Sequence, residues 1–433
     1  MSAPGNFSKT LKSLQKQSFD YFIHEVNPIN GLTADKTQPG APASIAAVGL
    51  ALAAYPVGVE NGFMSRLEAR RRTLSALRFF RHSSQSTAPS ATGYKGFYYH
   101  FLDMSTGARV WNCELSTVDT AFLIAGMLTA AAYFRNDTPG DVEIRELAEE
   151  LYCRVDWNWA RNGFGTVCMG WTPEAGFLPN NWGGYDEALL LYVLGFGSPT
   201  YPLPTGSYED WTRTYEWIQA YGIDYLYSAP LFTHQLSHLW IDFRAIQDEF
   251  MRGKGIDYFV NSRRATQVQQ LYAIDNPKNF EQYGTNCWGI TASDGPGPKR
   301  MNVKGRNIKF YDYLARGVPY GPDDGTLAPW AVAASLPFAP EIVVPAIEHY
   351  IHNLKLIDEN PYGFKATFNP TFPVRPASAN GWVSPWHVGI NEGPVVLMIE
   401  NFKSEMLWKM MGECRYIVDG LKRAGFTGGW LGG

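Results

Sequence analysis

The stretch WTPEAGFLPNNWGGYDEALLLYVLGFGSPTYP (Trp171–Pro202) joins a glycine-rich aromatic loop directly to an apolar helix. Two carboxylates, Asp186 and Glu187, lie where that helix is predicted to begin. Three aromatic residues lie on the same approach: Trp171, Trp182 and Tyr185. Because flat aromatic surface beside carboxylates is typical of a site that stacks on a ligand, we interpret this stretch as the mouth of a binding site.

The composition indicates which ligand suits such a site. Aromatic residues make up 15% of the 433-residue chain, with 14 Trp, whereas charged residues make up 18%. Sugar rings present apolar C–H faces, which suit Trp and Tyr because each joins a flat apolar body to one polar group. We therefore expect a carbohydrate ligand. The net charge of −4 gives no support to a nucleic-acid or membrane partner, because both need clustered positive charge.

Cysteine usage and the ends of the chain bear on the compartment. The five cysteines are odd in number, widely spaced and without a C-x-x-C pair, which argues against a disulfide framework or a zinc site. The first residues lack the apolar core of a signal peptide, and no window reaches the ~20 apolar residues of a membrane span. We expect a cytoplasmic protein, or a periplasmic or secreted one whose leader has been removed.

The periodicity of apolar residues predicts about a dozen helices, in which Ala/Leu-rich segments alternate with amphipathic ones. No βαβ rhythm, P-loop or dinucleotide fingerprint occurs in the sequence. Stacked helical hairpins bury one face of each hairpin, and loops at one end then carry the function. We predict an all-α protein whose residues 1–433 form a single α/α toroid. The predicted helices are Ser8–Glu25, Ala43–Tyr55, Ser65–Arg81, Ser116–Arg135, Asp141–Trp157, Tyr208–Tyr221, Trp240–Arg252, Gly255–Asp275, Thr326–Ser335, Pro340–Leu354, Gly393–Phe402 and Glu405–Lys422.

Glu187 is the first candidate for chemistry. A carboxyl group among aromatic rings has its pKa raised by desolvation and can act as a general acid toward a glycosidic oxygen. The alternative is that an acid at the start of a helix only complements the helix dipole. The neighbouring Asp186 points elsewhere, and we interpret it as structural.

Glu114 and Asp119 lie in the segment NCELSTVDTA. Ser116 followed by Asp119 fits a capping box, which gives Asp119 a structural alternative. Glu114 precedes the cap and should project from the loop. Glycosidases usually need two carboxyl groups, one protonated and one ionised, so Glu114 or Asp119 is a candidate partner of Glu187.

Other residues are candidates for binding a sugar rather than cleaving it. His234 and His238 have the spacing of one helix face, but HQLSH lacks the glutamate of a zinc protease, so we expect no metal. Asp294 lies in a turn that its side chain can close on the backbone. Trp288 and Trp382 could stack on a sugar ring, or each could be part of the hydrophobic core. The full set of candidate substrate-binding residues is Trp182, Tyr185, His100, His234, His238, Trp288, Asp294, Trp382 and Glu392.

Ten collinear motifs between about Gly31 and Trp408 resemble the bacterial glucoamylase-like family. That family includes endo-β-1,2-glucanases and the transglycosylating domain of cyclic β-1,2-glucan synthases. The motifs are GFYYHFLD, ELSTVDTA, GWTPEAGFLP, WGGYDEALLLYVLGFGSPTYP, HQLSHLWIDFR, IDYFVNSRRAT, WGITASDGP, DDGTLAPWAVAASLPFAPE, YGFKATFNPTF and PVVLMIENF.

The resemblance implies an (α/α)6 toroid without a cofactor that hydrolyses β-1,2-glucan, with inversion. It maps the family's acid onto Glu187 and its acidic cleft residues onto Glu114 and Asp119. One departure is GINEGP at Gly389–Pro394, where the family pattern is GIDQGP, and it bears on substrate length, linkage or mode of attack. Two alternatives stay open: an exo-acting β-glucan or α-glucan hydrolase, and a glucan-binding relative without catalysis.

Overall fold

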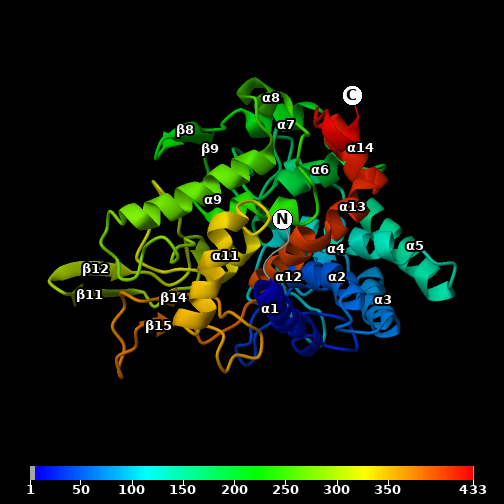
Figure 1. Cartoon of the computed structure of the whole chain (residues 1–433). Coiled ribbons are helices and arrows are strands. Elements are labelled where there is room, and N and C mark those ends of the chain that lie inside the picture. Colours follow the sequence, from blue (N-terminus) through cyan, green and yellow to red (C-terminus); the bar gives the residue numbers. More distant parts are fainter. Residues whose placement is uncertain (1–4, 433) are drawn as a thin grey trace. The chain divides into compact units, whose positions relative to one another are not determined.

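The computed structural model describes residues 5–432, which are mainly helical with many short strands (Figure 1). The chain forms two compact units, each made of segments far apart in sequence. The first contains the residues up to Asp20, Glu216–Leu236 and Phe259–Lys403, and the second contains Tyr21–Tyr215, Ser237–Tyr258 and the residues from Ser404. None of the helices within residues 5–432 combines the length and apolar character needed to cross a bilayer.

Four helices of the second unit lie side by side: α2 (Ile45–Glu60), α3 (Arg66–His82), α4 (Thr117–Tyr133) and α5 (Pro139–Cys153) (Figure 1). Helices α2 and α4 are almost wholly buried, as their Ala/Leu-rich sequences predict. Their backbones meet at Gly49 and Gly126, since a Cβ on Gly126 would lie 2.0 Å from the carbonyl oxygen of Gly49. This close approach fixes helix α4, whose first turn carries Asp119.

Helices α3 and α5 are amphipathic, and side-chain caps set where they begin. Ser65 Oγ accepts the backbone N–H of Glu68 at 3.2 Å, so Ser65 is the N-cap of α3. Basic side chains of α3 are paired: Arg70 binds Asp141, and Arg71 binds Glu68.

The remaining helices of the second unit are shorter than the sequence predicts. The predicted helix at Tyr208–Tyr221 ends at Thr212, and the one at Trp240–Arg252 is wrong, because only its last residues are helical. The predicted helix at Glu405–Lys422 is two helices. The observed elements are α6 (Leu189–Gly197), α7 (Gly206–Thr212), α8 (Glu249–Lys254), α13 (Met406–Gly412) and α14 (Arg415–Arg423).

A five-stranded antiparallel sheet in the second unit departs from the all-α expectation. Its strands pair in the order β2 (Gly93–Tyr94), β3 (Phe97–Tyr99), β5 (Leu115–Ser116), β6 (Gly170–Thr172) and β7 (Gly176–Phe177). A second small pair joins β1 (Ala43–Ser44) to β4 (Phe101–Leu102). Each of these strands has only two or three residues, so the alternation of apolar and polar residues that indicates a strand cannot be recognised in the sequence.

The first unit packs its helices around a core that includes Trp288, Trp330 and Tyr350. Gln15 Nε2 donates to the carbonyl oxygen of Val396 at 3.1 Å and so ties α1 to α12. The helical elements are α1 (Gly5–His24, in this unit as far as Asp20), α9 (Tyr258–Asp275, in this unit from Phe259), α10 (Pro329–Ala334), α11 (Pro340–Glu348), a π-helical turn (His349–Asn353) and α12 (Gly389–Ser404, in this unit as far as Lys403).

The segment from Tyr283 to Gly325, which contains none of the predicted helices, contains a regular hairpin. Strands β11 (Lys299–Val303) and β12 (Arg306–Phe310) pair over five residues each and are labelled in Figure 1. The other pairs of this unit are β8 (Trp217–Ala220) with β9 (Ile223–Leu226), β10 (Ala292–Ser293) with β13 (Leu314–Ala315), and β14 (Phe368–Asn369) with β15 (Trp382–Val383).

Candidate active site

The five-stranded sheet brings His100 and Glu114 together. His100 follows strand β3 and Glu114 precedes strand β5, and the two strands pair with Tyr99 opposite Leu115. The backbone N–H of His100 donates to the carbonyl oxygen of Glu114 at 2.9 Å, and His100 Nδ1 lies 2.8 Å from Glu114 Oε1. The two side chains remain 29% and 31% exposed, so a substrate can reach them.

Asp119 joins the same group from the first turn of helix α4. Its backbone N–H donates to Ser116 Oγ at 3.2 Å, and Ser116 Oγ donates to Asp119 Oδ2 at 2.5 Å. His100 Nε2 lies 3.6 Å from Asp119 Oδ2. Ser116 is therefore confirmed as the N-cap of α4, and its hydroxyl also holds the Asp119 carboxylate beside the imidazole.

The charges of this group set the protonation of His100. Burial by itself disfavours the imidazolium, but the carboxylates of Asp119 and Glu114 outweigh it and raise the pKa of His100 to about 9. Burial likewise opposes ionisation of Glu114, yet its hydrogen bond with His100 holds the pKa of Glu114 below the usual value. At neutral pH His100 is therefore a cation beside an ionised Glu114.

Glu187 lies in a turn two residues before helix α6 and is half-buried. Burial raises its pKa to about 7, and the negative charge of Asp119 adds to the rise. Glu187 and Asp119 are thus close enough to interact, although they lie 68 positions apart in the sequence. Since the helix begins only at Leu189, the structure gives Glu187 no place within its first turn.

Asp186 has a structural role, as the sequence predicts, because its side chain accepts hydrogen bonds from within the fold. Its Oδ1 atom accepts the N–H of Ala188 at 3.0 Å and the indole N–H of Trp211 at 3.2 Å. Burial and the neighbouring Glu187 raise the pKa of Asp186 well above its usual value.

Trp182 and Tyr185 support this site from within the fold. Each is only 8% exposed, which leaves little ring surface for a sugar. Trp182 Nε1 donates to Thr117 Oγ1 at 2.9 Å, and the ring of Tyr185 stacks on Tyr258 with centroids 5.7 Å apart. Both rings therefore hold the loop that carries Glu187.

Four of the predicted sugar-binding residues are buried, and the structure contradicts direct sugar contact for them: His234, His238, Trp288 and Glu392 are at most 2% exposed. Burial lowers the pKa of His234 to about 4, and its Nε2 lies 3.2 Å from the carbonyl oxygen of Ser228. The two histidines also share no helix face, because η2 (Leu231–His234) and η3 (Leu236–Leu239) are separate 3-10 turns.

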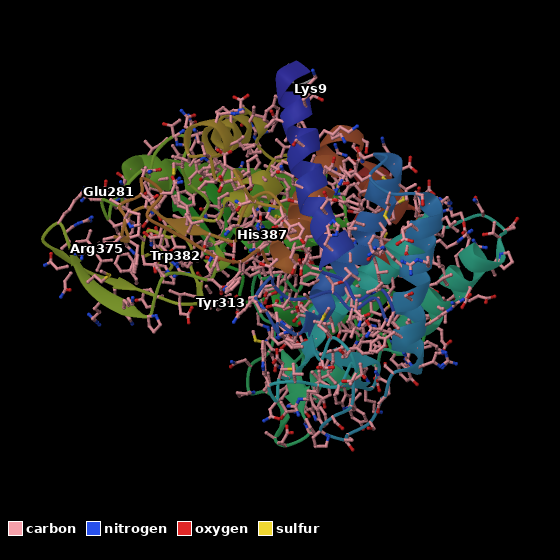
Figure 2. The ribbon with its side chains drawn as sticks, turned by 90° about the horizontal axis from the view of Figure 1, so that it is seen from below. Lys9, Glu281, Tyr313, Arg375, Trp382 and His387 are labelled. Carbon is pink, nitrogen blue, oxygen red and sulfur yellow. The ribbon has the colours of Figure 1, made fainter. Side chains whose placement is uncertain are left out.

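Trp288 and Glu392 belong to the interior of the first unit. Trp288 is wholly buried in its main apolar cluster. Glu392 Oε1 lies 3.2 Å from His387 Nδ1, and burial raises the pKa of Glu392. His387, labelled in Figure 2, is buried as well.

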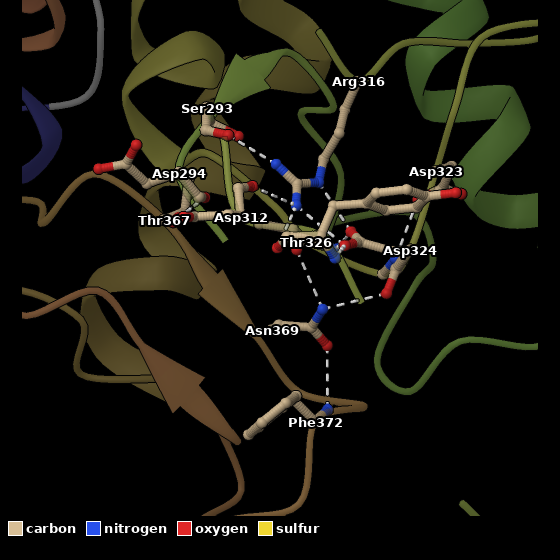
Figure 3. A network of polar contacts seen from close by, with 12 residues as sticks. Ser293, Asp294, Asp312, Arg316, Asp323, Asp324, Thr326, Thr367, Asn369 and Phe372 are labelled. Atoms are coloured by element: carbon tan, nitrogen blue, oxygen red, sulfur yellow. Dashed lines mark hydrogen bonds and ion pairs between the residues drawn. The ribbon is translucent and has the colours of Figure 1, made fainter. Parts of the chain in front are cut away.

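Asp294 and Trp382 are half-buried and stay candidates for contact with a substrate. The carboxylate of Asp294 points away from the Arg316 network in Figure 3, and its backbone oxygen accepts a hydrogen bond from Thr367 at 2.9 Å. Trp382, labelled in Figure 2, lies on strand β15 and packs against a cluster that contains Phe310 and Phe372.

The structure adds two residues that the sequence did not single out. The charge of Asp35 contributes to the raised pKa of His100. Gly170 of strand β6 leaves room for Glu114, since a Cβ there would lie 2.9 Å from Glu114 Cγ. Across residues 5–432, no three His, Cys, Asp or Glu side chains are placed to hold a metal ion.

A family model described as "Putative glucoamylase" matches residues 179–415, more than half of the chain. The chain belongs to this family. The matched residues include Glu187 and helix α6, whereas Glu114 and Asp119 lie before them.

Similar proteins cover almost the whole chain. A curated relative from Parabacteroides distasonis, an exo β-1,2-glucooligosaccharide sophorohydrolase (non-reducing end), is 27% identical over 94% of this chain. The chain spans 56% of that relative's length. The crystal structure of a "putative glucoamylase" from Bacteroides uniformis is 29% identical, with a TM-score of 0.87, over 99% of this chain and 100% of its own. An endo-β-1,2-glucanase from Chitinophaga pinensis, in complex with sophorotriose and glucose, is 25% identical with a TM-score of 0.85, over 98% and 99%.

Proposed function

We propose that this protein is a glycoside hydrolase that cleaves internal linkages of β-1,2-glucan and releases sophorooligosaccharides. The observation that carries the proposal is the difference between two kinds of carboxyl group in one site. Glu187 has a pKa of about 7, whereas His100 keeps the pKa of Glu114 low. Two carboxyl groups with opposite protonation are what hydrolysis of a glycosidic bond requires.

In the proposed mechanism, protonated Glu187 donates its proton to the glycosidic oxygen as the bond to the anomeric carbon breaks. An ionised Asp119 or Glu114 takes a proton from water, and the remaining hydroxide forms the new bond to the anomeric carbon. His100, as a cation beside Glu114, favours the ionised form of that carboxyl group. We propose inversion of configuration, which requires roughly 6.5–9.5 Å between acid and base for the water.

The names of similar proteins support the substrate. The relatives from P. distasonis and C. pinensis act on β-1,2-linked glucose chains, one as an exo-enzyme and one as an endo-enzyme. Exo-acting release of sophorose is therefore the second candidate function. Similarity to these structures over nearly the whole chain also supports our proposal that residues 1–433 form one (α/α)6 toroid.

The product profile tests the proposal. Linear β-1,2-glucan, laminarin and starch are each incubated with the protein, and the products are separated by thin-layer chromatography. A ladder of sophorooligosaccharides supports endo action, and sophorose alone supports exo action. If the protein releases glucose from starch and does not cleave β-1,2-glucan, the assigned linkage is wrong. Proton NMR of the first product anomer tests inversion.

Glu187→Gln tests the acid. The variant should lose turnover of β-1,2-glucan while it keeps the affinity of the wild type, since glutamine has the same shape but no proton to donate. Glu209→Gln on helix α7, an exposed acid of the same unit, is the matched control and should keep full activity. A wild type that binds the polymer without cleaving it would instead identify a non-catalytic glucan-binding protein.

A further inference from the structure

Trp111 is held in an unusual and exposed position beside the candidate acids. Its side chain is 67% exposed, whereas Trp157, Trp211, Trp240 and Trp288 are all fully buried. Its φ is +58°, and that of the following Asn112 is +49°. Bulky L-residues rarely adopt this left-handed conformation, because it costs free energy that the rest of the fold must supply.

A buried arginine maintains this conformation. The Arg109 side chain is 1% exposed, and its guanidinium donates to the carbonyl oxygens of Cys113 at 2.6 Å and Asn112 at 2.7 Å. Glu174, between strands β6 and β7, holds the same guanidinium through contacts of 2.7 and 3.1 Å. The loop that presents Trp111 is therefore fixed to the sheet that carries Glu114.

Ring contacts lead from Trp111 to the acids. The Trp111 ring contacts Phe101 at a tilt of 57°, with centroids 5.2 Å apart. Phe101 in turn stacks on His100, with centroids 3.9 Å apart and planes 13° apart. His100 in turn contacts Glu114 and Asp119. The exposed indole is thus two ring contacts away from the imidazole that joins the two carboxylates.

We propose that Trp111 is a stacking platform for a glucosyl unit of the bound chain, next to the unit that is cleaved. The proposal rests on the proposed function. A rigid aromatic face suits the apolar C–H face of a glucose ring. Because the loop is already fixed before binding, the sugar stacks without the entropic cost of ordering Trp111. The positive φ angles of Trp111 and Asn112 then keep the indole in its binding position before the sugar arrives.

Four variants test the platform. Trp111→Ala should raise KM for β-1,2-glucan by roughly threefold to tenfold with kcat nearly unchanged, and Trp111→Phe should restore most of the affinity. Trp111→Gly should weaken binding equally but keep or raise the Tm, because glycine adopts positive φ without a Cβ clash. Tyr201→Ala is the control. This tyrosine is 48% exposed but follows helix α6 at the end away from Glu187, so its loss should leave KM unchanged.

Calorimetric titration of the Glu187→Gln protein, with and without Trp111→Ala, separates the failure of the platform from that of the proposed function. The titrants are oligosaccharides of β-1,2-glucan, laminarin and starch. Equal affinity of the two proteins overturns the platform and leaves the hydrolase untouched. If the wild type binds a glucan but cleaves none, the proposed hydrolysis fails, and the same pair of titrations still decides the platform. If the wild type binds none of the three, both proposals fail.

Discussion

The imidazole of His100 lies between two carboxylates, 2.8 Å from Glu114 Oε1 and 3.6 Å from Asp119 Oδ2. The strand pairing of Tyr99 with Leu115 sets the first contact, and the cap of helix α4 sets the second. The site therefore holds a cation whose charge depends on pH, and this charge contributes to stability as well as to chemistry.

His100→Gln should destabilise the protein in a pH-dependent way. The folded pKa of His100, about 9, lies above its usual value of 6.5, so protonation favours the folded state. The stabilisation is complete below about pH 6.5 and is lost as the pH rises through about 9. We expect His100→Gln to cost up to about 3 kcal/mol at pH 6 and much less at pH 10.

Urea unfolding of wild type and variant at the two pH values measures this difference. His82→Gln, at an exposed histidine at the end of helix α3, is the control and should have only a small effect at both. A deficit that stays constant between pH 6 and 10 would show that His100 stabilises the fold without its charge.

The activity should decline on the alkaline side as Glu187 loses its proton. With a pKa of about 7 for Glu187, kcat/KM for β-1,2-glucan should fall about tenfold for each unit above that pH. Asp119→Asn removes a negative charge that raises this pKa, so the alkaline limb of the residual activity should move to lower pH. The pH profile of kcat/KM is the measurement. A limb that moves to higher pH contradicts the assigned interaction.

Gly170→Ala should impair the site without unfolding the protein. A Cβ at this position would lie 2.7 Å from the carbonyl oxygen of Leu115 and 2.9 Å from Glu114 Cγ, so Glu114 must move. We expect a loss in kcat of about tenfold or more, since small displacements of catalytic groups are costly.

Gly253→Ala on helix α8 is the matched control for Gly170→Ala. Its Cβ would meet nothing within 4 Å, so the substitution should keep activity and stabilise the protein by about 0.5–1 kcal/mol. Assays of kcat and Tm on both variants decide the point. Full activity of Gly170→Ala would mean that Glu114 plays no part in catalysis, or that strand β6 shifts to make room for the new Cβ and leaves Glu114 in place.

Local features of this fold could be predicted from the sequence, and contacts between distant segments could not. The caps at Ser65 and Ser116 depend on a spacing of three residues, so they are visible in the chain. The pairing of Leu115 with Trp171 joins two very short strands that lie 56 positions apart, and nothing local indicates it. The ion pair of His100 with Glu114 follows from strand pairing and was missed for the same reason.

Residue type also fails to separate core from site. The sequence placed Trp288 and Trp382 together as candidates for sugar contact, yet Trp288 is wholly buried and Trp382 is half-buried. The spacing of His234 and His238 predicted one helix face, but the segment forms two 3-10 turns in which that spacing has no such meaning. Of the sequence candidates, the structure brings together Glu114, Asp119 and His100, and Glu187 interacts with Asp119, whereas the acid Glu392 is buried elsewhere.

The pair of Arg316 and Asp324 should govern the stability of the first unit. Both side chains are fully buried, and two nitrogen atoms of Arg316 contact the carboxylate at 2.7 and 2.9 Å (Figure 3). Arg316 also donates to the carbonyl oxygen of Ser293 at 2.6 Å. Arg316→Met leaves the carboxylate and that carbonyl group buried without this partner, so it should cost about 3–5 kcal/mol.

Differential scanning calorimetry of Arg316→Met should therefore show a fall in Tm of several degrees. Lys304→Met, which breaks an exposed contact of 2.7 Å with Glu281, is the control and should cost less than about 1 kcal/mol. Since Arg316 lowers the pKa of Asp324 against the effect of burial, the pair should stabilise the fold at every pH above about 4. In the variant, burial acts on Asp324 without this partner and favours its protonated form, so the difference in Tm should be largest near pH 8 and narrow toward pH 5. A difference that grows as the pH falls would contradict the assigned ion pair.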